Sequence, residues 1–430
     1  MLALLDVWNC FASCEEVFRP VLRTVPFAVL GSNDGCVIAR NELARKIGVK
    51  MGEPAFKLRP LQDLNNLLLL SVNAELYSDM SMRVHSILSG LSDRVTPYSI
   101  DEIFADLNGM PGNHADRCRR MVERVETWTG LKMGCGIGQS ATLAKLGSFI
   151  AKQAIRRPGS YPVELAHICD LGSCSPSLLH DCLAATPVNE VWGVGRRYAD
   201  DLLQGGVINA LDLARFDPGT ARKRWGVVME RTIRELNGVS CITVEGKASK
   251  QQIVTSRSLA KAIESCDELE SIAALLVSNA ARKLRLQGSV CGAVSVYAMT
   301  SPFREGPRFA RSKVVPMGQP TCDDRKLAEA VTHGMRCIWE PGYELVKVGV
   351  MLVDLCDKAQ ADAQGRLELG MDDEPDAKES ALMLAVDQLN SRYGRKTVRL
   401  GVEQTQPITR SERMTPRYTT RLADVPVVRA

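Results

Sequence analysis

Three acidic residues stand at the ends of two apolar, strand-like segments. Asp101 and Glu102 are adjacent in a run rich in β-prone residues, and Asp6 closes the apolar residues 2–5. A solvated acidic pair at a strand edge is the simpler interpretation of Asp101 and Glu102 alone. Neighbouring side chains of a strand point to opposite faces, so two successive acids also fit a strand end that holds a cation. Three convergent carboxylates would repel one another unless divalent cations neutralised them, which raises the hypothesis of a metal centre.

Basic residues that could bind phosphate occur on two predicted helices. The first runs from Asn41 to Ile47 and carries Arg45, with Arg40, Lys46 and Lys50 close by. Lys145 and Lys152 are seven residues apart on one face of a later helix. Such cations are by default a solvated face, but they could equally bind a triphosphate. The preceding Gly-rich run GCGIG lacks the lysine of a Walker loop, so close strand packing explains it better.

Composition limits the class of protein. The chain has 430 residues, enough for three or four domains, and a net charge of +4 that does not by itself indicate nucleic-acid binding. The 14 cysteines contain no C-x-x-C pair, which is typical of a reducing compartment and argues against a zinc site. The N-terminus lacks a basic segment and reaches Asp6 early, so we expect neither a signal peptide nor a membrane span.

The first 160 residues predict a mixed sheet with helices on one face, an α+β domain. A hairpin is expected over residues 27–40, because Asp34-Gly35 supplies the backbone angles of a tight turn. Residues 73–90 have apolar positions at helical spacing and lead into the acidic strand. Pro158-Gly159 marks a domain boundary.

Two further segments indicate binding to a nucleic-acid backbone. Residues 164–238 predict short helices, and Gly193-Val194-Gly195 followed by Arg196 fits a helix-hairpin-helix that binds phosphate without reading bases. A plain helix cap is the alternative for this motif. Residues 251–355 predict a β-α-β-β-α-β domain with one open sheet face. Its basic residues gather in two groups, which are Arg282, Lys283 and Arg285, and Arg304, Arg308, Arg311 and Lys313. Residues 357–380 are polar, acidic and flexible in composition.

Motifs along nearly the whole chain, from Met1 to about Thr420, resemble the UmuC-type catalytic subunits of DNA polymerase V, a group of Y-family translesion polymerases. The motifs that carry the resemblance are DVWNCFASCEEVFRP, SNDGCVIARNELARKIGVKMGEP, AELYSDMSMRV, YSIDEIFADL, VWGVGRR, KQQIVTSRS and TPRYTTR. The resemblance implies a right-handed polymerase fold. Its parts would be a palm (1–25 and 80–163), fingers (26–79), a thumb with the helix-hairpin-helix (164–240), a little finger (250–355) and a partner-binding tail (356–430).

The resemblance also implies roles for individual residues. Asp6, Asp101 and Glu102 match the family's catalytic carboxylates and, with the Val7 carbonyl, would hold two Mg²⁺ ions. The other matches are Arg45 and Lys152 at the triphosphate, Phe11 as a steric gate against a ribose 2′-OH, and Gly193, Gly195, Arg196 and Arg257 at DNA. The family's first motif reads Asp-Val-Asn-Ala/Ser-Phe-Tyr, whereas Trp8, Asn9 and Cys10 stand here between Val7 and the gate. The packing of Trp8 and Cys10 beside the metals is therefore an open question.

The expected function is error-prone, template-directed DNA synthesis across lesions in the SOS response. Implied partners are primer-template DNA, dNTPs, a UmuD′-like dimer and a RecA filament, in a bacterial cytoplasm at the nucleoid and without a membrane. A sliding clamp would bind weakly, because the family's Gln-Leu-x-Leu-Phe peptide is reduced to RLELGM (366–371). Two alternatives are a catalytically impaired DNA-binding or scaffold relative, which would be expected to lose acids, and a palm-type nucleotide cyclase, which does not explain the hairpin motif.

Overall fold

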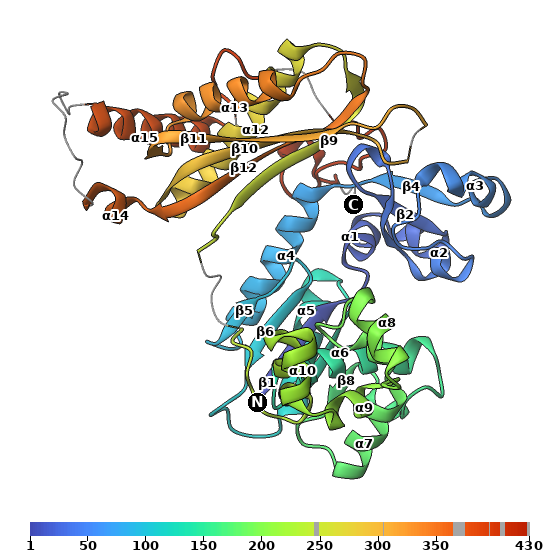
Figure 1. The fold of residues 1–430 in the computed structure, drawn as a ribbon. Helices are drawn as coiled ribbons and strands as arrows, with labels where there is room; N and C mark the ends of the chain where they lie inside the picture. The colour runs from blue at the N-terminus through green and yellow to red at the C-terminus, as the bar shows by residue number, and fades with distance from the viewer. Residues whose placement is uncertain (245–248, 304, 364–374, 395, 405–408, 428–430) are drawn as a thin grey trace. The chain divides into compact units, whose positions relative to one another are not determined.

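The computed structural model describes residues 1–244, 249–303, 305–363, 375–394, 396–404 and 409–427 (Figure 1). The chain divides into two compact units. Unit 1 comprises Met1–Gly246 and Arg413–Ala430, and unit 2 comprises Lys247–Glu412. Each unit has its own clusters of buried apolar side chains. Within the described residues, no helix combines the length and the apolar character that crossing a membrane requires.

The central sheet of unit 1 has the strand order β5-β6-β1-β7-β8. Strand β1 lies in the middle and pairs antiparallel with both β6 and β7, while β7 pairs parallel with β8. The strand bounds are Leu2–Val7 (β1), Val95–Pro97 (β5), Glu102–Asp106 (β6), Met133–Gly138 (β7) and Ile168–Asp170 (β8). The sheet therefore places the acidic end of β1 directly beside the start of β6.

Helices cover both faces of this sheet, so the prediction of helices on one face was wrong. Ala3, Leu5 and Val7 of β1 share a buried cluster with α1 (Cys10–Phe18), α4 (Ala74–Ser89) and α5 (His114–Thr129). Leu4 points to the other face and packs against Ala141 and Ala144 of α6 (Ala141–Arg156). The sequence of β1 gives the physical reason for this burial. Its apolar run is nearly continuous, as in a strand that is buried on both faces and so does not alternate apolar and polar residues.

A smaller sheet with the order β3-β2-β4 follows β1 and α1 in the chain. The expected hairpin is confirmed, since β2 (Phe27–Leu30) pairs antiparallel with β3 (Val37–Arg40). The expected Asp34-Gly35 turn is not found, because Asn33 and Asp34 have a positive φ whereas Gly35 does not. The predicted basic helix is also confirmed as α2 (Glu42–Lys46), and the Asn41 side chain caps it by accepting a hydrogen bond from the Ala44 amide. The remaining elements are α3 (Arg59–Asn65) and β4 (Leu68–Ser71), which pairs parallel with β2.

Short helices fill residues 176–236, as predicted. They are α7 (Pro176–Ala185), α8 (Arg196–Gln204), α9 (Ala210–Arg215), α10 (Pro218–Trp225) and α11 (Val227–Leu236). Gly193 has a φ of 90°, a conformation that favours glycine, and Gly195 caps the N-terminus of α8. A single 3-10 turn, Val188–Glu190, precedes this loop. In the expected helix-hairpin-helix, the segment directly before the glycine loop is therefore shorter than a full helix.

Unit 2 has the predicted β-α-β-β-α-β order and a sheet with the strand order β11-β10-β12-β9. Helices α12 and α13 pack on one face of that sheet. The bounds are Ile253–Ile263 (β9), Cys266–Leu286 (α12), Ser289–Thr300 (β10), Ala310–Thr321 (β11), Asp324–Ile338 (α13) and Leu345–Asp357 (β12). Two further helices follow, α14 (Lys358–Ala363) and α15 (Pro375–Tyr393).

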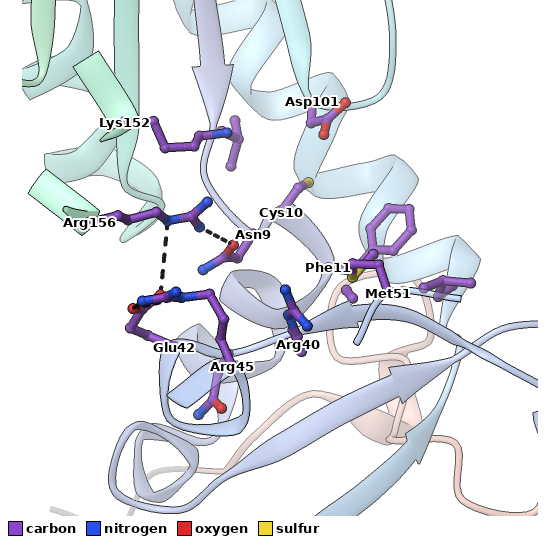
Figure 2. Close-up of a pocket in the computed structure, with 14 residues that line it drawn as sticks. Asn9, Cys10, Phe11, Arg40, Glu42, Arg45, Met51, Asp101, Lys152 and Arg156 are labelled. Atoms are coloured by element: carbon purple, nitrogen blue, oxygen red, sulfur yellow. Dashed lines mark hydrogen bonds and ion pairs between the residues drawn. The ribbon is translucent and has the colours of Figure 1, made fainter. Parts of the chain in front are cut away.

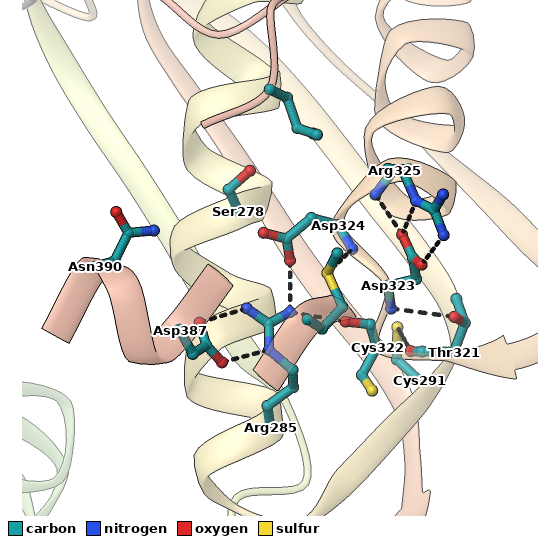
Figure 3. A network of polar contacts seen from close by, with 12 residues as sticks. Ser278, Arg285, Cys291, Thr321, Cys322, Asp323, Asp324, Arg325, Asp387 and Asn390 are labelled. Atoms are coloured by element: carbon teal, nitrogen blue, oxygen red, sulfur yellow. Dashed lines mark hydrogen bonds and ion pairs between the residues drawn. The ribbon is translucent and has the colours of Figure 1, made fainter. Parts of the chain in front are cut away.

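Helix α15 is held to unit 2 by an ion-pair network around Arg285 (Figure 3). The guanidinium donates to Asp324 at 2.5 Å and to Asp387 of α15 at 2.7 and 2.9 Å. Burial lowers the pKa of Arg285, but the hydrogen bonds to Asp387 and Asp324 outweigh it and raise that pKa. Arg285 therefore fastens the tail helix, and assigning it to an exposed basic surface was wrong. Arg304 and the clamp-like residues 366–371 lie outside the described residues.

The end of the chain returns to unit 1. Residues 413–418, which we call the C-terminal strap, lie along β4 and the start of α4. The Ser71 amide donates to the Arg413 carbonyl at 3.0 Å, and the Arg413 amide donates to the Ser71 hydroxyl at 2.9 Å. Tyr418 stacks on Phe18 of α1, with ring centroids 4.9 Å apart. The strap thus contacts elements that precede it by more than 300 residues.

The Arg285 network predicts the effect of removing Asp387. We expect Asp387→Ala to release α15, because it removes two charge-assisted hydrogen bonds from a mostly buried guanidinium, at a cost of roughly 1.5–3 kcal/mol. Hydrogen exchange of α15 amides measures this release. Gln388→Ala, an exposed neighbour on the same helix, is the matched control. Unchanged protection in Asp387→Ala would show that the network does not hold the helix.

Candidate active site

The three acidic residues predicted from the sequence lie together at the end of the central sheet. Asp6 and Glu102 are direct cross-strand partners in the pairing of β1 with β6. Asp101 immediately precedes β6, and its carbonyl accepts a hydrogen bond from the Val7 amide at 2.8 Å. The Asp6 carboxylate is buried, with 7% of the residue exposed. Strand pairing therefore brings two distant sequence segments to one site.

Two lysines of α6 neutralise two of these carboxylates. Lys145 donates to both oxygens of Glu102 at 2.9 Å, and Lys152 forms an ion pair with Asp6. The third carboxylate, that of Asp101, accepts a hydrogen bond from the Ser99 hydroxyl at 2.5 Å. The sequence argument expected divalent cations to balance this charge. In the structure the prediction that Lys145 and Lys152 share a helix face is confirmed, and this face supplies the balance.

The donor set fits Mg²⁺ chemically. Carboxylate oxygens and a backbone carbonyl, here from Asp6, Asp101, Glu102 and Val7, are the hard ligands that this ion prefers. As the side chains are placed, no group of three His, Cys, Asp or Glu residues in the described part of the chain is close enough to hold a metal. Binding would therefore need Asp6 and Glu102 to turn from their lysines, and buried carboxylates such as Asp6 require a cationic partner in either arrangement.

A cavity of about 260 Å³ opens next to the acids and is rich in cations (Figure 2). Arg40, Arg45, Lys152 and Arg156 line it together with Asp101. Burial lowers the pKa of Arg40, and the charge of Arg45 lowers it further. Burial likewise lowers the pKa of Arg156, and the charge of Arg45 lowers it further. Mutual repulsion of this kind would be relieved by a bound anion of high charge.

Polar contacts hold these cations in place. Arg45 donates to Glu42 at 2.9 Å, and Arg156 donates to the Asn9 side chain at 2.7 Å. Arg156 also lies 3.9 Å from Glu42, as the dashed lines in Figure 2 show. Sequence reasoning missed the role of Arg156, although its position four residues after Lys152 on one helix face was a usable signal.

An aromatic side chain forms one wall of the cavity. Phe11 lies in α1, lines the cavity and stacks on Tyr77 of α4, with ring centroids 4.7 Å apart and the planes at 14°. Tyr77 is completely buried, so it backs the Phe11 ring from the protein interior. Phe11 therefore presents to the cavity an aromatic ring that is supported from behind.

The structure answers the question about Trp8 and Cys10. Trp8 is not among the residues that line the cavity, and it stacks on His167 with centroids 5.3 Å apart. Its indole also covers Gly134 of β7. Cys10 does line the cavity but is only 6% exposed, so its small thiol leaves the space open. Neither residue obstructs the acidic cluster.

The residues predicted to contact DNA lie in both units of the chain. Gly193, Gly195 and Arg196 belong to the helical part of unit 1 and are not among the residues lining the cavity. Arg257 is exposed on β9 of unit 2, opposite Val348 in the register with β12. Val348 is part of the buried cluster under α12 and α13, so the register directs Arg257 toward the helix side of that sheet.

Comparison with known protein families matches three stretches of the chain. Residues 5–148 match the impB/mucB/samB family, residues 250–367 match the C-terminal domain of that family, and residues 380–428 match a domain of unknown function (DUF4113). Protein UmuC of Salmonella typhimurium strain LT2 is 38% identical over 99% of both chains. Protein ImpB of Salmonella typhimurium is 37% identical over 100% of both chains.

The fold is also that of solved polymerase structures. A chimeric Y-family DNA polymerase superposes with a TM-score of 0.63 at 19% identity, covering 83% of this chain and 99% of its own. At that level of identity the likeness concerns the fold alone. It confirms the α+β multidomain architecture expected from the sequence.

The contact between Trp8 and Gly134 predicts a sensitive position next to the acids. A Cβ added at Gly134 would lie 2.5 Å from the indole ring, so we expect Gly134→Ala to destabilise unit 1 by about 1–3 kcal/mol. Thermal unfolding measures the change. Gly90→Ala is the control, because its Cβ would meet nothing closer than 3.4 Å. An unchanged melting temperature for Gly134→Ala would contradict the packing of Trp8.

Proposed function

We propose a residue-level mechanism for this chain, which belongs to the impB/mucB/samB family. The chain is an error-prone, template-directed DNA polymerase for translesion synthesis in the SOS response. One observation carries the mechanism: Asp6 and Glu102 lie opposite each other on paired strands, and Asp101 and Val7 beside them open onto a cavity lined by four cations. Acids and cations arranged in this way suit a metal-bound triphosphate.

Asp6, Asp101, Glu102 and the Val7 carbonyl would hold the two Mg²⁺ ions. When bound, these ions supply Lewis-acid stabilisation of the attacking 3′ oxygen and of the leaving pyrophosphate. The lysines have a defined part in this arrangement. Lys152 pairs with Asp6 and Lys145 with Glu102, and each carboxylate would turn from its lysine to bind a metal ion. Lys152 also lines the cavity and can pass from Asp6 to a phosphate oxygen.

The cationic wall of the cavity would bind the incoming dNTP. Arg45 and Lys152 are the residues that the family resemblance assigns, and Arg40 belongs to the basic group noted in the sequence. The structure adds Arg156 as a neighbour on the same wall. A guanidinium group can bind two phosphate oxygens at once. Burial, and after it the charge of Arg45, lowers the pKa of Arg40, and a bound anion would offset both effects. Phe11 would face the sugar and exclude a 2′-OH by its bulk.

DNA would be held outside the cavity. The amides around Gly193 and Gly195, with the exposed Arg196, would bind the duplex backbone, and Arg257 would contribute from unit 2. A UmuD′-like dimer and a RecA filament are the proposed protein partners, with a sliding clamp as a weak one. The proposed location is the nucleoid in the bacterial cytoplasm. These assignments rest on family membership and on the positions of the residues.

Primer extension distinguishes this function from that of an impaired scaffold. We expect Asp101→Ala to reduce Mg²⁺-dependent extension on a lesion template about a thousand-fold or more, because several kcal/mol of transition-state charge stabilisation depend on the metal ligands. Asp93→Ala, an exposed aspartate away from the cavity, should be neutral. The assay is run with and without a UmuD′ dimer and RecA filaments. Extension that survives Asp101→Ala would refute the assigned carboxylates, and no extension by the parent chain in either condition would favour the scaffold.

Sugar discrimination tests the assigned gate. Phe11→Ala should raise ribonucleotide incorporation relative to deoxyribonucleotide incorporation by roughly 10- to 100-fold, because it removes the wall that a 2′-OH would meet. The measurement is the ratio of kcat/KM for dCTP and CTP opposite a template guanine. The same ratio in the parent and in Phe11→Ala would remove Phe11 from the gate role.

A further inference from the structure

A buried hydrogen-bond chain connects the C-terminal strap to the aromatic wall of the cavity. Thr415 of the strap donates its hydroxyl to Glu15 of α1 at 3.0 Å. The Tyr77 hydroxyl donates to the same carboxyl oxygen at 2.7 Å, and the Tyr77 ring stacks on Phe11. Thr415 and Phe11 are 404 positions apart in the sequence, yet two hydrogen bonds and one ring contact join them.

The surroundings of this chain leave it little freedom. Glu15 and Tyr77 are fully buried, and Thr415 is 4% exposed. Burial raises the pKa of Glu15, while the hydrogen bonds from Tyr77 and Thr415 lower it. The other Glu15 oxygen has no hydrogen-bond partner among the described residues, so these two hydroxyls are the groups that satisfy the buried carboxyl. Removing either one leaves a buried acceptor less satisfied, which is costly inside a protein.

The strap is fixed at several points beside Thr415. The Asn73 amide donates at 3.1 Å to the carbonyls of Thr415 and Pro416 and to the Thr415 hydroxyl. Asn73 also caps α4, the helix that carries Tyr77. Arg417 lies 3.2 Å from Glu75 of the same helix. The strap therefore sets the position of the N-terminal end of α4 as well as that of the Tyr77 hydroxyl.

We propose that the C-terminal strap is a positioning element for sugar selection: Thr415, acting through Glu15 and Tyr77, holds Phe11 where it meets the ribose of the incoming nucleotide. This inference rests on the proposed function, because it requires Phe11 to be the gate. It assigns a role to the end of the segment that matches a domain of unknown function. Thr415, Glu15 and Tyr77 are positioning residues, since none of them lines the cavity.

The test uses the full-length chain and the ratio of kcat/KM for dCTP and CTP opposite a template guanine. Thr415→Val removes the strap hydroxyl with little change of shape, and Tyr77→Phe removes the second hydroxyl but keeps the ring stack. A variant that only loses stability contains less active enzyme. This lowers kcat/KM equally for both nucleotides and leaves their ratio unchanged. Loss of gate positioning changes the ratio itself.

Both variants should lower discrimination against CTP by about 3- to 10-fold, in line with the loss of one buried hydrogen bond. In the double variant the effects should be less than additive, because both hydroxyls act through Glu15. Thr420→Val, the same substitution at an exposed position just beyond the strap, is the matched control and should keep the parent ratio.

Phe11→Ala separates failure of the inference from failure of the proposed gate. If Phe11→Ala relaxes discrimination while Thr415→Val and Tyr77→Phe both keep the parent ratio, the gate stands and the strap has no positioning role. If Phe11→Ala also keeps the parent ratio, the gate assignment fails and the inference fails with it. If Thr420→Val relaxes discrimination against CTP as much as Thr415→Val does, the specific role of Thr415 is likewise overturned.

Discussion

The pairing of Asp6 with Glu102 across two antiparallel strands is the constraint on which the active site depends. Two carboxylates on one face of a sheet, one of them buried, repel each other unless positive charge lies directly above them. Helix α6 supplies that charge with two lysines placed seven residues apart. The need to cover this face explains why α6 packs there, on the side of β1 opposite α4 and α5. A metal ion in place of either lysine would satisfy the same constraint.

The nucleotide cavity is built from segments that lie far apart in the chain. Cations come from β3, α2 and α6, the aromatic wall comes from α1, and its support comes from α4. The chain terminus adds a further layer, because the strap bonds to Glu15 and Asn73 behind the wall. Under the proposed gate role of Phe11, sugar selection would involve this buried polar network as well as a single bulky ring.

The basic residues of unit 2 differ in their surroundings: some form ion pairs within the fold, and others are exposed. Arg285 belongs to a local group of basic residues, yet two carboxylates hold it and it fastens α15. Arg336 is also bound to a carboxylate, that of Glu270 at 2.6 Å, although its side chain is exposed. For Arg285 burial is the reason for the pairing, because a guanidinium largely removed from water needs carboxylate partners. Arg257, by contrast, is exposed on β9.

The sequence alone determined the elements and the chemical residues: the acids at strand ends, the basic helix, the hairpin, the β-α-β-β-α-β order of unit 2 and the family. These follow from local periodicity, turn residues and long motifs. Only the tertiary structure decided that helices cover both faces of the central sheet, that lysines balance the acids, that Trp8 turns away from the cavity, and that Thr415 reaches the support of Phe11. Each of these depends on contacts between residues distant in the sequence, and no local pattern encodes which distant partner a buried charge or hydroxyl will meet.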